Sequence, residues 1–287
     1  MSEQLPREYS ELLVRHDGPI SWIILNRPER LNALSSTMLR EIETSLLILE
    51  QRRATRVIII RGEGRAFCSG YDVENDGEEI GDAAARDLIE DRRRLEQNIE
   101  TFLSIWKHPK PVIAAVHGYC IAGGVQLATL CDLTVVAEDT RIGVPSLPIG
   151  GGYISPMLVP LIGPKRAKQL SFQAGTHIDG RTSVEWGWAN FSTPEGELLE
   201  RAEALARNIA LTPADVLSVK KAAVNRAADL MAWSTIMPLG SETDALLHSS
   251  RTIEYVQQRI MELGLKEAIR QFRDGKFQEE FDRLLGS

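Results

Sequence analysis

The sequence lacks any hydrophobic run long enough to cross a lipid bilayer. Its first residues, MSEQLPREYS, also lack the basic and apolar regions of a secretory signal. We therefore expect a cytoplasmic protein that has no membrane as a partner.

Cysteine is scarce, and the spacing of the three cysteines matches no disulfide or metal framework. Cys68, Cys120 and Cys131 are odd in number, lie in apolar surroundings and form no CxxC pair. We expect all three to be reduced and buried, and we expect no metal site.

Positive charge is in deficit, because 33 lysines and arginines face 40 aspartates and glutamates, giving a formal net charge of -7. This balance disfavours a broad surface for nucleic acid, so no nucleic-acid partner is expected. A local basic pocket for an anionic cofactor is compatible with it.

What is present is typical of a globular protein, with 43% hydrophobic and 25% charged residues in 287 positions. Apolar, β-branched runs predict strands over residues 20–26, 56–62, 111–118 and 132–138. Amphipathic stretches between them predict a helix capped by Ser35 or Ser36 and another over residues 85–106. This alternation predicts parallel pairing and the α/β class. Beyond about Pro164 only helical patterns follow, and these need a partner surface.

Two glycine-bearing turns follow the second and third predicted strands, GRAFCSGYD at residues 64–72 and GYCIAGG at residues 118–124. Turns after parallel strands emerge at one edge of the sheet, where ligands tend to bind. Two backbone amides aimed at one oxygen would form an oxyanion hole. Glycine turns are more often structural, so spacing alone leaves both interpretations open.

The order of four motifs resembles that of the enoyl-CoA hydratase/isomerase family, also called the crotonase superfamily. They are LNRPERLNALS, GRAFCSGYDV, KPVIAAVHGYCIAGGVQLATLCDLTVVAED and IDGRTSVEWGWAN, between roughly Leu12 and Asn190. The resemblance implies a crotonase-like spiral of strand-strand-helix turns with a helical C-terminal region, assembled as a homotrimer or a dimer of trimers. We accordingly expect an acyl-CoA-binding core over residues 1–200 and a helical region over residues 201–287, which packs on the core or on a neighbouring subunit.

The resemblance also implies the chemistry of the site. Family members bind acyl-CoA thioesters and stabilise a thioester enolate with two backbone amides, which fall here at Tyr71 and Gly123. No cofactor beyond the CoA moiety of the substrate is implied. The positions expected near that moiety are Arg27, Arg30, Ser69 and Asp72. The two arginines could equally be an exposed charge pair beside a turn.

The sequence departs from the family pattern at the acid and base positions. Similar hydratases use two glutamates, and the matching positions here are Gln126 and Ser146. Neither side chain can act as a carboxylate base, so the two-glutamate hydration mechanism is not expected. A replacement could come from Tyr71, Asp72, Glu74, Asp76 or Tyr153.

Other conspicuous residues favour structural roles. His117 has no identifiable catalytic partner, and Cys68 has no visible activating neighbour. Asp132 is expected to anchor a strand start, while Trp186 and Trp188 are expected in the core or in a pocket wall.

Three hypotheses remain. The first is an acyl-CoA lyase or isomerase of this family. The second is a specialised carbon-carbon bond hydrolase or isomerase that uses another acid or base. The third is a catalytically silent acyl-CoA-binding protein.

Overall fold

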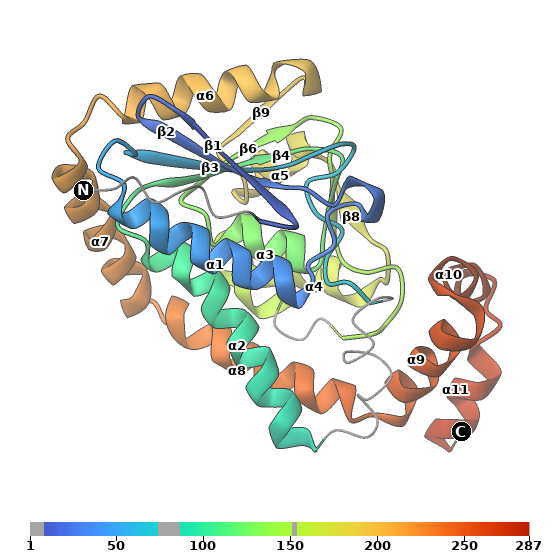
Figure 1. The fold of residues 1–287 in the computed structure, drawn as a ribbon. Coiled ribbons are helices and arrows are strands. Elements are labelled where there is room, and N and C mark those ends of the chain that lie inside the picture. Colours follow the sequence, from blue (N-terminus) through green and yellow to red (C-terminus); the bar gives the residue numbers. More distant parts are fainter. Residues whose placement is uncertain (1–8, 74–86, 151–153, 287) are drawn as a thin grey trace.

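The four predicted strands lie side by side in the main sheet of the structure, a computed structural model that describes residues 9–73, 87–150 and 154–286 (Figure 1). They are β2 (Ile20–Leu25), β3 (Val57–Gly62), β4 (Val112–Val116) and β6 (Leu133–Ala137). Each pairs in parallel with the next, which confirms the predicted parallel α/β arrangement.

Five further strands were not predicted. β1 (Leu12–Asp17) pairs antiparallel with β2, and β9 (Phe191–Thr193) closes the other edge of the six-stranded sheet. A second, three-stranded sheet contains β5 (Tyr119–Ile121), β7 (Arg141–Gly143) and β8 (His177–Ile178). The sequence did not predict β5, β7 and β8 because they are too short to show an alternating pattern. It did not predict β1 because most of that strand is exposed and lacks a long apolar run.

Helices cover both faces of the main sheet, which explains why its inner strands are apolar throughout. Ile58 and Ile60 of β3 face one layer, which contains α1 (Ser36–Gln51) and α2 (Leu88–Lys107). Val57 and Ile59 face the opposite layer, which is formed by α6 (Leu198–Ile209) (Figure 1). Because α6 seals this second core, the predicted division at residue 200 falls inside a helix of the sheet domain.

Side-chain caps mark several helix starts. Ser35 accepts a hydrogen bond from the Met38 amide at 3.0 Å, as the sequence predicted for one of the two serines. Asp87 caps α2, and Asp179 caps α5 (Gly180–Trp186). The other helices in this half are η1 (Pro28–Arg30), α3 (Gly123–Thr129), α4 (Ile154–Phe172) and η2 (Glu195–Glu197).

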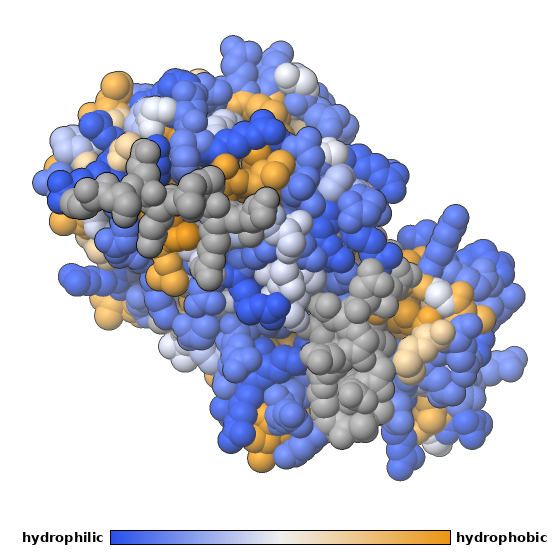
Figure 2. Space-filling view, in the orientation of Figure 1, coloured by the Kyte–Doolittle hydropathy of each residue, from blue (hydrophilic) through white to orange (hydrophobic). Residues whose placement is uncertain are grey.

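The C-terminal region is helical, as predicted. Its helices are α7 (Ala214–Leu230), α8 (Trp233–His248), α9 (Arg251–Leu263), α10 (Leu265–Arg273) and α11 (Gln278–Leu285). Helix α8 runs beside α2, whereas α9 to α11 form a lobe set apart from the sheet (Figure 1). This C-terminal lobe has its own apolar cluster around Val256, Ile260 and Phe277, and some of its hydrophobic side chains are visible at the surface (Figure 2).

Among the described residues, none of the helices combines the length and the apolar character needed to span a membrane. The three cysteines are free and buried, as predicted.

Candidate functional site

The two glycine turns meet at one edge of the main sheet. Cys68 and Cys120 form a parallel bridge, and the Cys68 amide donates to the Tyr119 carbonyl at 2.9 Å. A Cβ added to Gly70 would lie 2.9 Å from the Ala122 Cβ, and one added to Gly124 would lie 2.5 Å from the Cys68 carbonyl oxygen. These two positions therefore need glycine because the turns approach each other so closely.

Gly123 begins the helix that follows the second turn. Ala122 before it has φ 51° and ψ -116°, a backbone conformation that residues other than glycine rarely adopt. The first amides of a helix have no acceptor within it, and in the described part of the chain none accepts from the Gly123 amide. A Cβ on Gly123 would lie 3.1 Å from Tyr71 Cε2. The structure thus brings the predicted pair, Tyr71 and Gly123, into contact.

Gln126 lies one turn further along α3, with 0% of its surface exposed. Its Oε1 accepts a hydrogen bond from the Tyr71 hydroxyl at 2.9 Å. Its Nε2 is buried and has no hydrogen-bond partner in the described part of the chain. The amide at the usual glutamate position therefore accepts a hydrogen bond from Tyr71. Its Nε2 can still donate one to a bound ligand.

A cavity of about 600 Å³ extends from these turns toward the C-terminal lobe. This volume lies within the range of small-molecule sites. The walls of the cavity include Arg30, Ser69, Tyr71, Asp72 and Ser146, all of them predicted site residues. Helices α2, α8, α9 and α10 also contribute wall residues. One cavity therefore gathers most of the predicted site, together with helices that the motifs did not include.

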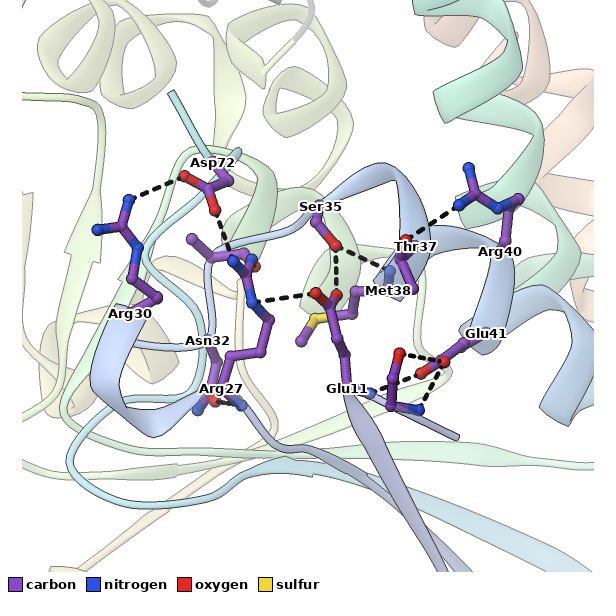
Figure 3. A network of polar contacts seen from close by, with 12 residues as sticks. Glu11, Arg27, Arg30, Asn32, Ser35, Thr37, Met38, Arg40, Glu41 and Asp72 are labelled. Carbon is purple, nitrogen blue, oxygen red and sulfur yellow. Dashed lines mark hydrogen bonds and ion pairs between the residues drawn. The ribbon is translucent and has the colours of Figure 1, made fainter. Parts of the chain in front are cut away.

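Three of the four predicted CoA-binding residues, Arg27, Arg30 and Asp72, form a network of ion pairs (Figure 3). Asp72, with only 2% of its side chain exposed, accepts from Arg27 Nη2 at 2.7 Å and from Arg30 Nη2 at 3.2 Å. Arg27 also pairs with Glu11 at 3.2 Å and donates to the Ala33 carbonyl at 2.8 Å. Arg27 and Asp72 thus hold the first turn in place, whereas Arg30 also reaches the cavity. That these residues contact CoA stays a prediction.

Asp72 is therefore held as an ion-pair partner of two arginines, which disfavours its use as the replacement base. Tyr71 remains on the cavity wall with its hydroxyl bonded to Gln126. The other replacement candidates, Glu74, Asp76 and Tyr153, lie outside the described residues.

The residues assigned structural roles occupy structural positions. His117 Nε2 lies 2.8 Å from the Gly64 carbonyl oxygen, and Asp132 Oδ2 accepts from the Val112 amide at 2.7 Å. Burial raises the pKa of the Cys68 thiol to about 12, which removes its nucleophilic thiolate at neutral pH. Trp188 is 7% exposed and donates to Thr129 Oγ1 at 2.8 Å, while Trp186 packs beside Arg166.

Sequence reasoning missed a charged group between α2 and α8. His248 Nδ1 lies 2.8 Å from Asp91 Oδ2, and Arg94 Nη2 lies 2.8 Å from Asp91 Oδ1. Burial opposes ionisation of Asp91, but the hydrogen bonds from His248 and Arg94 outweigh it and lower the pKa of Asp91 to about 2. Asp244 and His248 line the cavity beside Gly150. Asp91 and His248 are 157 residues apart, so no local pattern could have paired them.

Within the described ranges, no cluster of three or more histidine, cysteine or carboxylate side chains is arranged to hold a metal ion. The absence of a metal from the site stays a prediction.

Comparison with known proteins gives a consistent result. The sequence profile of the enoyl-CoA hydratase/isomerase family matches residues 15–253. A Thermus thermophilus protein described as an enoyl-CoA hydratase is 34% identical over 67% of this chain and 75% of its own. The hydroxycinnamoyl-CoA hydratase-lyase of Pseudomonas fluorescens is 31% identical over 75% of this chain and 77% of its own. The crystal structure of an enoyl-CoA hydratase/isomerase from Xanthobacter autotrophicus superposes with a TM-score of 0.86 at 32% identity, covering 94% of this chain and 99% of that one.

Proposed function

This chain belongs to the enoyl-CoA hydratase/isomerase family, whose enzymes act on acyl-CoA thioesters, and on that premise we propose that its cavity stabilises a thioester enolate. The predicted crotonase fold is confirmed by the solved structures that superpose on it. In the proposed reaction the backbone amides of Tyr71 and Gly123 donate to the thioester oxygen.

One observation carries this proposal. Two turns from separate strands meet so closely that glycine is required, and the Gly123 amide lies at the start of a helix beside the Tyr71 ring. An amide in such a position can stabilise a developing oxyanion by roughly 3 to 4 kcal/mol in a site that excludes water. The same donors serve water addition, double-bond migration and carbon-carbon cleavage, because all three pass through an enolate.

The leading proposal is a lyase or isomerase reaction on an enoyl-CoA that does not use two glutamates. Gln126 takes no proton near neutral pH, and Ser146 on the cavity wall can donate or accept a hydrogen bond but is not a carboxylate base. The Tyr71 hydroxyl, held by Gln126 at 2.9 Å, is the group of the described site best placed to deliver or receive a proton.

A second candidate is a specialised enzyme that cleaves or rearranges a carbon-carbon bond. It is favoured by the replacement of both glutamates and by the likeness to a hydratase-lyase. A panel of enoyl-CoA and 3-oxoacyl-CoA thioesters, followed by mass spectrometry, separates the possibilities. Water addition or isomerisation supports the leading proposal, and cleavage products support the second. Tight binding without any product would instead support a silent acyl-CoA-binding protein.

The oxyanion assignment predicts that Gly123→Pro loses at least about a hundredfold in kcat, because proline removes the amide donor. Proline is otherwise accepted at the first position of a helix. Gly123→Ala is the matched control, since it adds a Cβ near Leu34 and Tyr71 but keeps the N–H. A folded Gly123→Pro enzyme as active as Gly123→Ala would contradict the assignment.

We also propose the cytoplasm as the location and a homotrimer or dimer of trimers as the assembly. An exposed apolar face on α7 supports an assembly, with Val216, Val219 and Leu230 at 39%, 70% and 91% exposure.

A further inference from the structure

The end of the cavity remote from the glycine turns has a polar wall, which we call the polar end. Its residues come from three helices that no family motif of the sequence included. They are Arg94 of α2, Asp244 and His248 of α8, and Gln257 of α9. Helices α2 and α8 run side by side there (Figure 1).

The distance from Tyr71 to the ion pair of Asp91 with His248, beside the polar end, follows from the geometry of α2. Phe102 packs edge-on against the Tyr71 ring, with centroids 6.5 Å apart, and so marks the glycine-turn end of the helix. Asp91 lies eleven residues before Phe102 on almost the same face, which at the helical rise is roughly 16 Å away. The charged group is therefore too far from Tyr71 to act on the carbons next to a thioester bound there.

The cavity also has an apolar wall. Leu95, Leu147, Ile149, Leu265 and Ile269 line it. A hydrocarbon or aromatic acyl group lying along this wall would bury its apolar surface and bring its far end to the polar residues.

Gln257 shows that the polar end is suited to a ligand. Its residue is only 6% exposed, and its buried Oε1 has no hydrogen-bond donor in the described part of the chain. A buried acceptor without a donor is costly, so such an atom calls for a partner that the described residues do not supply. The group that fits it must donate a hydrogen bond.

His248 offers a hydrogen-bond donor that complements the acceptor Gln257 Oε1. Its Nδ1 donates to the Asp91 carboxylate at 2.8 Å, which leaves Nε2 on the side of Gly150. A Cβ on Gly150 would lie 2.8 Å from this Nε2 and 3.0 Å from Asp244 Oδ1, so both atoms face the same point of the cavity wall.

Charge at the polar end is balanced. The carboxylates of Asp91 and Asp244 face the cations Arg94 and His248, the latter when it is protonated. A charged ligand group would be repelled by either the two carboxylates or the two cations. A neutral group that both donates and accepts a hydrogen bond can interact favourably with a donor and with an acceptor. A hydroxyl has this property.

We propose that the polar end binds a hydroxyl group on the acyl chain, at the end remote from the thioester. The hydroxyl donates to Gln257 Oε1 and accepts from Nε2 of the protonated His248 ring, whose Nδ1 donates to Asp91. The substrates are thus acyl-CoA thioesters with an apolar middle and a hydroxylated end, which rests on the proposed function and makes it more specific.

The test compares trans-2-enoyl-CoA thioesters of increasing chain length, each with and without a terminal hydroxyl, in calorimetric binding and in turnover. The wild-type enzyme is expected to prefer the hydroxylated member of the pair that reaches the polar end. In Gln257→Leu this preference falls about tenfold, as expected for one lost hydrogen bond. Gln257→Met, of similar length, is the second variant if leucine disturbs folding.

Gln258→Leu is the matched control, because this neighbouring glutamine is exposed and bonds to Glu262 at 2.8 Å. It should keep the wild-type preference. Equal binding of both members of every pair, or an unchanged preference in both Gln257 variants, would overturn the hydroxyl subsite and leave the proposed function standing. Failure to bind any acyl-CoA would overturn both.

Discussion

Gln126 and Tyr71 form the most informative residue pair of the site. The glutamine occupies the usual glutamate position, yet its side chain is fully buried and bonded to the tyrosine. Its Nε2 has no acceptor among the described residues, which costs stability, since a buried donor without an acceptor loses its hydration and gains nothing in return. The contact itself offsets part of that loss and fixes the position of the Tyr71 hydroxyl.

This pair predicts a strongly non-additive mutant cycle. Tyr71→Phe leaves Gln126 Oε1 buried without a donor and should lower the free energy of unfolding by about 1 to 3 kcal/mol. Gln126→Met removes the unpartnered amide as well as the acceptor and should cost less. The double variant should be more stable than Tyr71→Phe alone. Urea unfolding of the four proteins measures the coupling, and additive effects would show that the two side chains do not interact.

At the scale of elements, the contact between α2 and α8 includes a buried charge pair, Asp91 with His248. Burial lowers the pKa of His248, but the hydrogen bond to Asp91 and the charges of Asp244 and Asp91 outweigh it, against opposition from Arg94, so the pKa is raised above 6.5. A pKa raised in the folded state stabilises the protein below the unfolded value, and this stabilisation is lost as the pH rises through the folded value.

We therefore expect the advantage of the wild type over His248→Gln in the free energy of unfolding to be larger near about pH 6 than near about pH 9. Asp91 adds no slope in this window, because its pKa of about 2 lies below it. Denaturant titrations across this range measure the difference. His177→Gln is the control, because this exposed histidine joins no ion pair in the described part of the chain. A difference that stays constant with pH would contradict the assignment.

At the scale of the whole molecule, Lys221 of α7 ties the C-terminal helices to the sheet. Its Nζ lies 2.7 Å from Asp132 Oδ2, 3.1 Å from the Ile105 carbonyl oxygen and 3.2 Å from that of Lys110. Only 7% of the Lys221 side chain and 17% of the Asp132 side chain are exposed. Asp132 therefore anchors the strand start and also holds a helix 89 residues further along the chain.

Lys221→Met should lower the free energy of unfolding by about 3 to 5 kcal/mol, because it leaves the Asp132 charge buried and unpaired. Adding Asp132→Asn to this variant should recover part of the loss. Lys220→Met, at the exposed neighbouring position, should change stability little. Chemical denaturation of the four proteins tests the expectation, which would be wrong if the Lys221 and Lys220 variants were equally stable.

The sequence by itself determined the features that depend on near neighbours in the chain. Apolar, β-branched runs predicted β2, β3, β4 and β6, because strands buried on both faces need apolar side chains throughout. The Ser35 cap followed from the hydrogen-bonding needs of a helix start, and the motifs identified the family and predicted the Tyr71 and Gly123 pair.

Only the tertiary structure decided which distant residues meet. The pairing of Asp91 with His248, the tether from Lys221 to Asp132 and the place of Gln257 in the cavity wall depend on how whole helices pack. The burial of Gln126 behind Tyr71 likewise appears only once the two turns are in contact. Backbone propensity acts over a few residues, whereas these contacts join segments that only the packed core brings together, so no local pattern contains them.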